Sequence, residues 1–130
     1  MNITVIGADR PLGAALAAGL GPEFEVTAIG QTAAEGCRAV DILERDALDA
    51  ALAGAGAVVF AAAFDAEADS EQELLDMAAR GAYVALTAAV AAGSGRVVLI
   101  SRLDLLRDYP ERYAIDPQWN PIPRANAQEL

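Results

Sequence analysis

The fold is decided by the first twenty residues, "MNITVIGADRPLGAALAAGL" (residues 1–20). The β-branched run at 3–6 predicts a short buried strand, which ends at Gly7. Pro11 suits the first turn of a helix, and the leucines that follow it recur every four residues. A strand, a glycine-bounded loop and a helix in this order form a unit whose helix N-terminus can hold a phosphate group.

Strand and helix patterns continue to alternate along the chain to about residue 101. Further strands are predicted at 24–29, 39–42, 57–62 and 96–101, with helices at 46–53 and 70–92. Short connections between alternating elements favour a parallel sheet with helices on both faces. The predicted fold class is therefore α/β: a three-layer, doubly wound, Rossmann-type parallel sheet of about five strands. Such sheets bind ligands at the carboxyl ends of their strands.

Both later helices carry a predicted buried face. Asp46 is expected to cap the first of them, with Leu48 and Leu52 toward the core. Ser70 and Glu73 have the spacing of a capping box at the start of the longer helix. The side chains expected on the buried face of that helix are Leu74, Met77, Val84 and Val90.

The 130 residues of the chain suffice for one domain with a sizeable core. This domain is predicted to cover residues 1–107, because the composition changes at about residue 108. Residues 108–130 contain four prolines, the chain's one tryptophan and two of its three tyrosines, without clear periodicity. They are expected to form an irregular, proline-rich C-terminal tail.

Charge and composition exclude several classes of function. The net charge of −10 leaves no electrostatic footprint for nucleic acid or an anionic membrane, so neither partner is expected. Histidine and lysine are absent from the sequence, which excludes histidine triads, histidine metal sites and lysine Schiff bases, and no metal site is predicted. A single cysteine (Cys37), no secretory signal and apolar stretches too short to cross a bilayer predict a cytoplasmic protein.

Four stretches within residues 1–102 resemble one known family. They are "VIGADRPLGAAL" at 5–16, "VDILERDALDAALAGAGAVVFAAA" at 40–63, "ARGAYVALTAAVAAG" at 79–93 and "RVVLIS" at 96–101. In order and spacing they are similar to the N-terminal Rossmann portion of the short-chain dehydrogenase/reductase superfamily, in particular its extended branch of NAD(P)-dependent sugar-nucleotide epimerases and dehydratases. The resemblance implies a domain that binds a dinucleotide, NAD or NADP.

The resemblance assigns roles within the glycine loop. Gly7 and Gly13 match the first and last glycines of the family's Gly-x-x-Gly-x-x-Gly loop, which allow a tight turn and close packing of helix on strand. Arg10 stands where the middle glycine lets the backbone approach the diphosphate. Its side chain either obstructs the diphosphate, supplies it with a cation that would suit the 2′-phosphate of NADP, or points to solvent from a loop no longer used. Leu12, at the start of the helix, is a further predicted cofactor contact.

The resemblance implies more cofactor contacts after the later strands. Asp41 matches the aspartate that accepts a hydrogen bond from the adenine amino group, and Ile42 beside it would line the adenine pocket. Small residues that leave room for the ribose and diphosphate follow the fourth strand, and Ser101 after the fifth strand is also expected at the cofactor. The small residues are Ala61, Ala62 and Ala63.

The end of the second strand does not indicate a preference between the two cofactors. Relatives that prefer NAD place an acid there for the ribose hydroxyls, and relatives that prefer NADP place a base nearby. This chain has Gly30 and Gln31 instead. Gln31 is expected to hydrogen-bond a ribose or a phosphate without selecting strongly between NAD and NADP.

The family's catalytic residues are not matched. The family uses a Ser or Thr after the fifth strand and a Tyr-x-x-x-Lys in the next helix, where the lysine lowers the pKa of the tyrosine. Arg102 stands at the hydroxyl position, Ala78 replaces an expected asparagine, and Tyr113 is followed four positions later by Pro117. No catalytic residue is therefore predicted, and it stays open whether the chain is a piece of a longer enzyme or a minimal relative. A longer active form would be an NAD(P)-dependent epimerase/dehydratase or reductase.

The leading interpretation is an NAD(P)-binding Rossmann domain without complete catalytic machinery. The alternative is a degenerate Rossmann module with a regulatory or protein-interaction role and no cofactor, and a third is an enzyme with an unusual acid/base such as Asp104 or Tyr113. A weak homodimer is expected through the alanine-rich helix at 70–92, unless the tail folds back over the exposed edge of the sheet.

Overall fold

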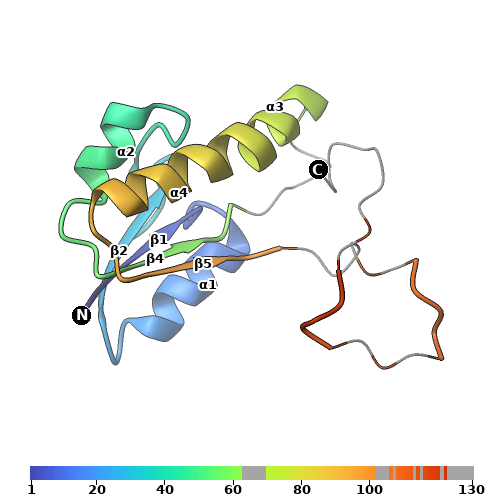
Figure 1. Ribbon diagram of the computed structural model, residues 1–130. Helices are drawn as coiled ribbons and strands as arrows, with labels where there is room; N and C mark the ends of the chain where they lie inside the picture. Colours follow the sequence, from blue (N-terminus) through green and yellow to red (C-terminus); the bar gives the residue numbers. More distant parts are fainter. Residues whose placement is uncertain are drawn as a thin grey trace.

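The computed structural model describes residues 1–62 and 70–101, together with residues 106, 108–112, 114, 116–120 and 122. Its centre is a five-stranded, all-parallel sheet with the strand order β3-β2-β1-β4-β5 (Figure 1). The strands are β1 (Asn2–Ile6), β2 (Glu25–Gly30), β3 (Arg38–Ala39), β4 (Ala57–Phe60) and β5 (Arg96–Leu99). The predicted α/β fold with a doubly wound sheet is confirmed.

The middle strand β1 fixes the place where a ligand can bind. It pairs with β2 on one side, Ile6 opposite Ile29, and with β4 on the other, Ile6 opposite Phe60. The chain runs outward to β3 on one side and then returns to build β4 and β5 on the other. The strand order therefore reverses next to β1, and in such sheets the crevice outside the carboxyl ends at this point receives the ligand.

Helices cover both faces of the sheet. They are α1 (Pro11–Leu20), α2 (Arg45–Ala51), α3 (Glu71–Leu75), the π-helical segment η1 (Asp76–Gly81) and α4 (Ala82–Ala91). Figure 1 shows α1 on one face, with α2 and the continuous helix from α3 to α4 on the other. Each face has its own core: Val5 packs with the α1 side, while Leu48 and Val58 pack with α4.

The long helix starts as predicted. The Oγ of Ser70 accepts a hydrogen bond from the backbone N–H of Glu73 (3.3 Å), and a carboxylate oxygen of Glu73 accepts one from the N–H of Ser70 (2.8 Å). These reciprocal bonds form the capping box. The π-helical turn of η1 within this helix was not predicted. Gly81, the last residue of η1, lies against the sulfur of Met77.

One residue of the predicted buried face of this helix is on the wrong side. Leu74 and Val84 are buried and Met77 is partly buried, but Val90 is 77% exposed. Val90 lies six residues after Val84, which turns it about 240° around an α-helix and away from the sheet. Alanines take its place, because Ala85, Ala88 and Ala89 fill the buried face.

The region before α2 differs from the prediction in detail. Strand β3 is only two residues long, because the chain turns at Asp41, whose carbonyl accepts a hydrogen bond from the N–H of Glu44 (3.2 Å). Glu44, not Asp46, is the N-cap of α2, and it caps the helix without a side-chain hydrogen bond. Asp46 lies inside the first turn, where its charge suits the helix dipole. The predicted core positions Leu48 and Leu52 are confirmed, since both are fully buried.

The helical stretch Glu71–Ala91 is long and apolar enough to cross a membrane by length and composition. This corrects the expectation that every apolar stretch of the chain is too short. Its buried face nevertheless packs on the sheet, with Val84 and Ala88 inside the core, and core helices of globular proteins meet the same criterion. The absence of a membrane partner stays a prediction.

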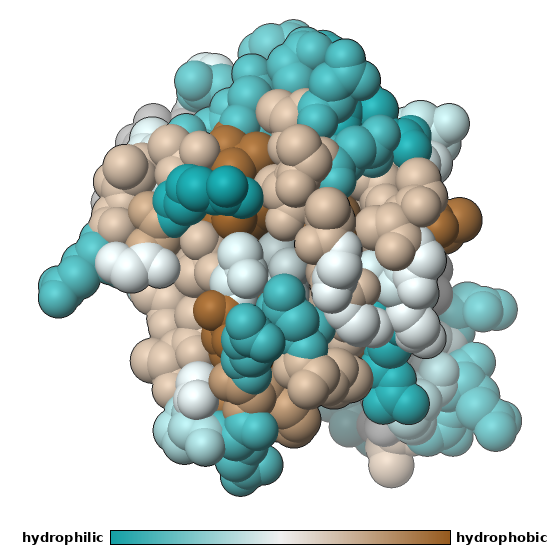
Figure 2. Space-filling view, turned by 90° about the vertical axis from the view of Figure 1, so that its left-hand side faces the viewer, coloured by the Kyte–Doolittle hydropathy of each residue, from teal (hydrophilic) through white to brown (hydrophobic). Residues whose placement is uncertain are grey.

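Two further surfaces bear on partners. Figure 2 views the side where the N-terminus lies, and the described residues there mix hydrophilic and weakly hydrophobic groups, with only isolated strongly hydrophobic ones.

In the tail, the rings of Tyr109 and Trp119 meet edge to face at 4.6 Å, and the Tyr109 hydroxyl donates to the carbonyl of Asn120 (2.8 Å). The predicted domain boundary at residue 107 is not tested by these contacts and stays a prediction.

Candidate functional site

The loop after β1 is built around two glycines that cannot carry a side chain. Gly7 has a φ of +92°, and a Cβ there would lie 2.6 Å from the backbone of Ala61 and Ala62. A Cβ on Gly13 would overlap the carbonyl group of Gly7. The N–H groups of Gly7 and Ala8 both donate to the carbonyl of Ile29 (2.9 Å each), which ties the loop to the end of β2. The loop thus has the close approach of helix to strand expected of a dinucleotide fold.

The start of α1 presents backbone donors beside this loop. Arg10 is the N-cap, without a side-chain capping bond, and Pro11 occupies the first helical position. In the part of the chain that the structure describes, the N–H groups of Leu12 and Gly13 donate to no acceptor. The first turn of α1 contains no acidic residue. Unused donors at the positive end of a helix dipole form an environment that stabilises an anion.

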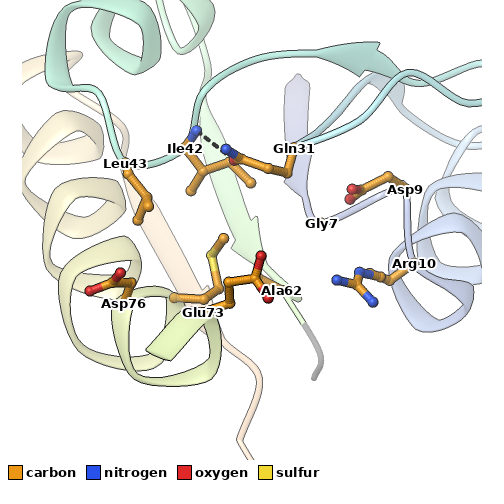
Figure 3. Close-up of a pocket in the computed structure, with 10 residues that line it drawn as sticks. Gly7, Asp9, Arg10, Gln31, Ile42, Leu43, Ala62, Glu73 and Asp76 are labelled. Carbon is orange, nitrogen blue, oxygen red and sulfur yellow. Dashed lines mark hydrogen bonds between the residues drawn. The ribbon is translucent and has the colours of Figure 1, made fainter. Parts of the chain in front are cut away.

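A pocket of about 250 Å³ opens at the carboxyl ends of β1, β2 and β4. This volume lies just below the range of about 300–1,000 Å³ typical of sites for whole small ligands, so it suits part of a dinucleotide. Figure 3 shows the pocket between the glycine loop on one side and the α3–η1 helix on the other. The pocket is lined by Gly7, Asp9, Arg10, Gln31, Ile42, Leu43, Ala62, Glu73, Asp76 and Met77.

Arg10 is the cation among the lining residues, which also include three carboxylates. Its guanidinium reaches into the pocket from the glycine loop (Figure 3), and the residue is half-buried. Of the three alternatives from the sequence, this orientation disfavours an arginine that points to solvent from an unused loop. Glu73 and Asp76 line the helix side of the pocket, and of these two only the carboxylate of Glu73 lies toward Arg10 in Figure 3. The lining therefore holds more acidic than basic side chains.

The Gln31 amide closes a small polar network on the other side of the pocket. Its Nε2 donates to Oδ1 of Asp41 (3.2 Å), and its Oε1 accepts from the backbone N–H of Ile42 (3.0 Å). The N–H of Leu43 also donates to Oδ1 of Asp41 (3.0 Å). Because the backbone N–H is only a donor and the carboxylate only an acceptor, this pairing fixes the orientation of the amide. Asp41 and Ile42 together therefore present an acceptor and a donor side by side.

A second polar network joins the glycine loop to the end of β2. Oδ2 of Asp9 accepts hydrogen bonds from the backbone N–H and the hydroxyl of Thr32, both at 3.1 Å. The other oxygen of the carboxylate lies over Gly30, where a Cβ would overlap it. The missing side chain of Gly30 thus creates the space that Asp9 fills.

The lone cysteine lies behind this network. Cys37 is buried, and its sulfur is within 4.0 Å of the carbonyl of Thr32. Burial raises the pKa of the Cys37 thiol, and the neighbouring Asp9 carboxylate raises this pKa further. The raised pKa favours the protonated thiol at neutral pH, which lowers its reactivity as a nucleophile.

The structure brings together five of the residues predicted at the cofactor. Gly7, Arg10, Gln31, Ile42 and Ala62 line the pocket. Gly13 and Ala61 lie beneath it, packed against Gly7, and Asp41 holds the amide of Gln31. The side chain of Leu12 is 42% exposed, so this residue offers the site its backbone N–H. Ser101 is exposed and does not line the pocket, so its contact with a cofactor is the least supported.

Some predicted residues lie outside the part of the chain that the structure describes, and some residues that line the pocket were not predicted. Ala63, Arg102, Asp104 and Tyr113 lie outside the described residues. The lining residues that the sequence analysis missed are Asp9, Leu43, Glu73, Asp76 and Met77. A signal for Asp9 was present: an acid stands in the glycine loop, and the end of β2 lacks the acid expected there.

Comparison with known proteins gives matches by structure alone. No family model and no curated protein sequence matches the chain. Three of the solved structures that match it share 25–26% identity with it, at TM-scores of 0.65–0.69. The first is a mutant of uronate dehydrogenase from Agrobacterium tumefaciens complexed with NAD, at 26% identity and a TM-score of 0.65, and the match covers 77% of this chain and 40% of that one. The second is a short-chain dehydrogenase/reductase superfamily protein from Agrobacterium tumefaciens with bound NAD, at 26% identity and a TM-score of 0.69, over 85% of this chain and 36% of that one. The third is a double mutant of dTDP-glucose 4,6-dehydratase from Streptomyces venezuelae with NAD bound, at 25% identity and a TM-score of 0.66, over 81% of this chain and 40% of that one.

These matches confirm the resemblance that the sequence indicated. The chain has the fold of the Rossmann portion of the short-chain dehydrogenase/reductase superfamily, in its epimerase/dehydratase-like branch. It spans between 36% and 40% of the length of these three structures. Their common ligand is NAD.

Proposed function

We propose that this protein binds a nicotinamide dinucleotide at the carboxyl ends of β1, β2 and β4. The observation that carries the proposal is the pair of unused N–H groups of Leu12 and Gly13 beside Arg10, at a turn where Gly7 admits no side chain. These groups would hold the diphosphate by charge-assisted hydrogen bonds. The NAD bound in the matching structures supports the same ligand class.

The adenine would meet the acceptor and donor that Asp41 and Ile42 present. Its amino group is a donor and its neighbouring ring nitrogen N1 an acceptor, the same pair that the Gln31 amide now offers to these two residues. Adenine binding therefore requires that the Gln31 side chain leave. One pair of hydrogen bonds replaces another, so the exchange adds little net affinity.

The bound cofactor would supply hydride-transfer chemistry, and this chain's own residues would only bind and orient it. No lysine occurs in the sequence, so a tyrosine activated by lysine cannot form within this chain. We therefore propose an oxidoreductase-like binding domain without its own catalytic acid/base. An enzyme that uses Asp104 or Tyr113 instead stays a less supported alternative.

A second candidate function is a Rossmann module that has lost its cofactor and binds another protein. The Gln31 amide favours it, because this side chain already satisfies the groups that adenine would use. The exposed apolar side chains of α4, Tyr83 and Val90 among them, offer such a module a surface. The two functions differ in whether a dinucleotide binds at all.

Calorimetric titration distinguishes these functions. The protein would be titrated with NAD, with ADP-ribose, and with nicotinamide mononucleotide as the fragment that lacks adenosine. Dinucleotide binding predicts similar affinities for NAD and ADP-ribose and none for the mononucleotide, since the pocket fits the adenosine diphosphate half. No binding of NAD at millimolar concentration, by either the protein or its Gln31→Ala variant, would favour the module without a cofactor.

A further inference from the structure

The last residue of β2 is a glycine without a side chain, but the carboxylate of another residue lies beside it. Gly30 is the last residue of this strand, and a Cβ there would overlap Oδ1 and Cγ of Asp9. The carboxyl group of Asp9 therefore lies where a side chain at position 30 would begin. Asp9 belongs to the loop after β1, and its carboxylate lies against the end of the neighbouring strand β2.

Several bonds hold the Asp9 carboxylate in this position. The loop is fastened to β2 by the N–H groups of Gly7 and Ala8 on the carbonyl of Ile29. Thr32 then donates two hydrogen bonds to the same carboxylate oxygen, Oδ2. Among the described residues, no hydrogen bond is made to Oδ1, and Asp9 lines the pocket (Figure 3). The Asp9 carboxylate is thus held in place at the edge of the pocket before any ligand binds.

We propose that Asp9 makes this site selective for NAD over NADP; the inference rests on the proposed dinucleotide function. In dinucleotide Rossmann sites the ribose of the adenosine lies near the end of the second strand, where an acid accepts hydrogen bonds from its hydroxyls. Oδ1 of Asp9 would accept those bonds. A phosphate on the 2′-oxygen would instead lie beside a fixed carboxylate, and the two like charges would repel each other.

The other charges of the pocket agree with this selection. Glu73 and Asp76 add negative charge on the helix side of the pocket. Arg10, which would suit a 2′-phosphate, is the N-cap of α1 and lies beside the N–H groups of Leu12 and Gly13, so its charge serves the diphosphate. The cation and the Asp9 carboxylate are adjacent in the chain and serve different parts of one ligand.

The test compares NAD and NADP in the protein and in its Asp9→Asn variant. An asparagine at position 9 keeps an oxygen that can accept from Thr32, and it removes the charge. Asp46→Asn is the matched control, because Asp46 is exposed on α2 and makes no contact with the pocket. We expect the unchanged protein to bind NAD at least about tenfold tighter than NADP, as the cost of a like-charge contact implies. This ratio should fall toward one in Asp9→Asn and stay the same in Asp46→Asn.

Each other outcome overturns the proposal in a recognisable way. Equal affinity for NAD and NADP in the unchanged protein contradicts the selection while leaving dinucleotide binding intact, and this measurement needs no variant to fold. An equal loss of both ligands in Asp9→Asn assigns Asp9 a structural role in the loop. No binding of either ligand overturns the proposed function, and the selection with it.

Discussion

Two regions of the molecule, the carboxyl ends of β1 to β3 and the opposite edge of the sheet at β5, differ in the side chains that they present at the surface. At the carboxyl ends of β1, β2 and β3, polar side chains pair with one another: Asp9 with Thr32, and Gln31 with Asp41. At the other edge, β5 and the nearby helix α4 leave large apolar side chains exposed, and Val90 is the most exposed of them. The first region holds the groups of the proposed dinucleotide site, and the second exposes apolar side chains of the kind that protein interfaces bury.

The strongest test of the first region is the contact between two glycines. Gly13→Ala places a Cβ against the backbone of Gly7, which cannot move aside. We expect it to lower the free energy of unfolding by about 1–3 kcal/mol, as overpacking does, and to abolish dinucleotide binding. Gly19→Ala in the same helix is the control, because its Cβ would meet nothing within 4 Å. It should raise stability by about 0.5–1 kcal/mol. Denaturant unfolding measures the stability of both variants, and equal effects of Gly13→Ala and Gly19→Ala would contradict the close approach of Gly13 to Gly7.

Arg10 decides whether the glycine loop attracts or obstructs the diphosphate. Arg10→Gln should weaken NAD binding by about tenfold or more, since a hydrogen bond to a charged group contributes about 1.5–3 kcal/mol. Arg96→Gln, on the exposed strand β5, is the control for the change of charge. Calorimetry measures both variants. Tighter binding by Arg10→Gln would show that the side chain obstructs the site.

Gln31 tests whether the polar network competes with the ligand. Removal of its amide in Gln31→Ala frees Asp41 and the N–H of Ile42 for adenine. We expect NAD to bind about fivefold tighter, because one hydrogen bond contributes about 1 kcal/mol. If affinity falls instead, Gln31 contacts the ribose or a phosphate, as the sequence analysis expected.

The apolar side of the comparison predicts self-association. The weak homodimer was predicted from the small residues of the 70–92 helix, but Ala85, Ala88 and Ala89 are buried against the sheet. The dimer therefore has to use Tyr83, which is 68% exposed, and Val90. Val90→Asp should lower the association constant about threefold, since burying part of a valine contributes about 0.5–1 kcal/mol. Sedimentation at several concentrations measures this, and a monomer at all of them contradicts the dimer.

The smallest expected effect is at Cys37. Its raised pKa has burial as the main cause and the Asp9 carboxylate as the second. The folded state holds the thiol proton more tightly than the unfolded state, so this contribution to stability is full below about pH 8.5 and is lost as the pH rises through the folded pKa. The rate of alkylation against pH should show a midpoint above that of a free thiol, and Asp9→Asn should move the midpoint down. A midpoint at or below that of a free thiol contradicts the burial.

The sequence predicted those parts of the fold that local patterns determine. The β-branched run of β1 and the capping box at Ser70 follow from a few neighbouring residues, and both are confirmed. The buried face of the long helix was harder to predict, because its alanines look alike whichever way they point. Val90 was mistaken for a core residue for this reason, and the π-helical segment η1 leaves no mark in the composition.

The candidate site could be predicted only in part, because its contacts depend on strand register. Gly7 and Gly13 carry their own signal, since a tight turn before a helix needs them. The contact between Asp9 and Gly30 joins residues far apart in the chain and exists because Ile6 pairs with Ile29. Asp76 lines the pocket only because the long helix packs on that face of the sheet, which no local pattern specifies.

An NMR titration of ¹⁵N-labelled protein with NAD would show whether the carboxyl end of the sheet binds a dinucleotide. We expect saturable shifts of the amide signals of Leu12, Gly13 and Ile42, the first two for the diphosphate and the third for adenine. Thr32 should shift with them, because it holds Asp9. Shifts confined to α4 or β5, or no shifts at millimolar NAD, would contradict dinucleotide binding at this end of the sheet.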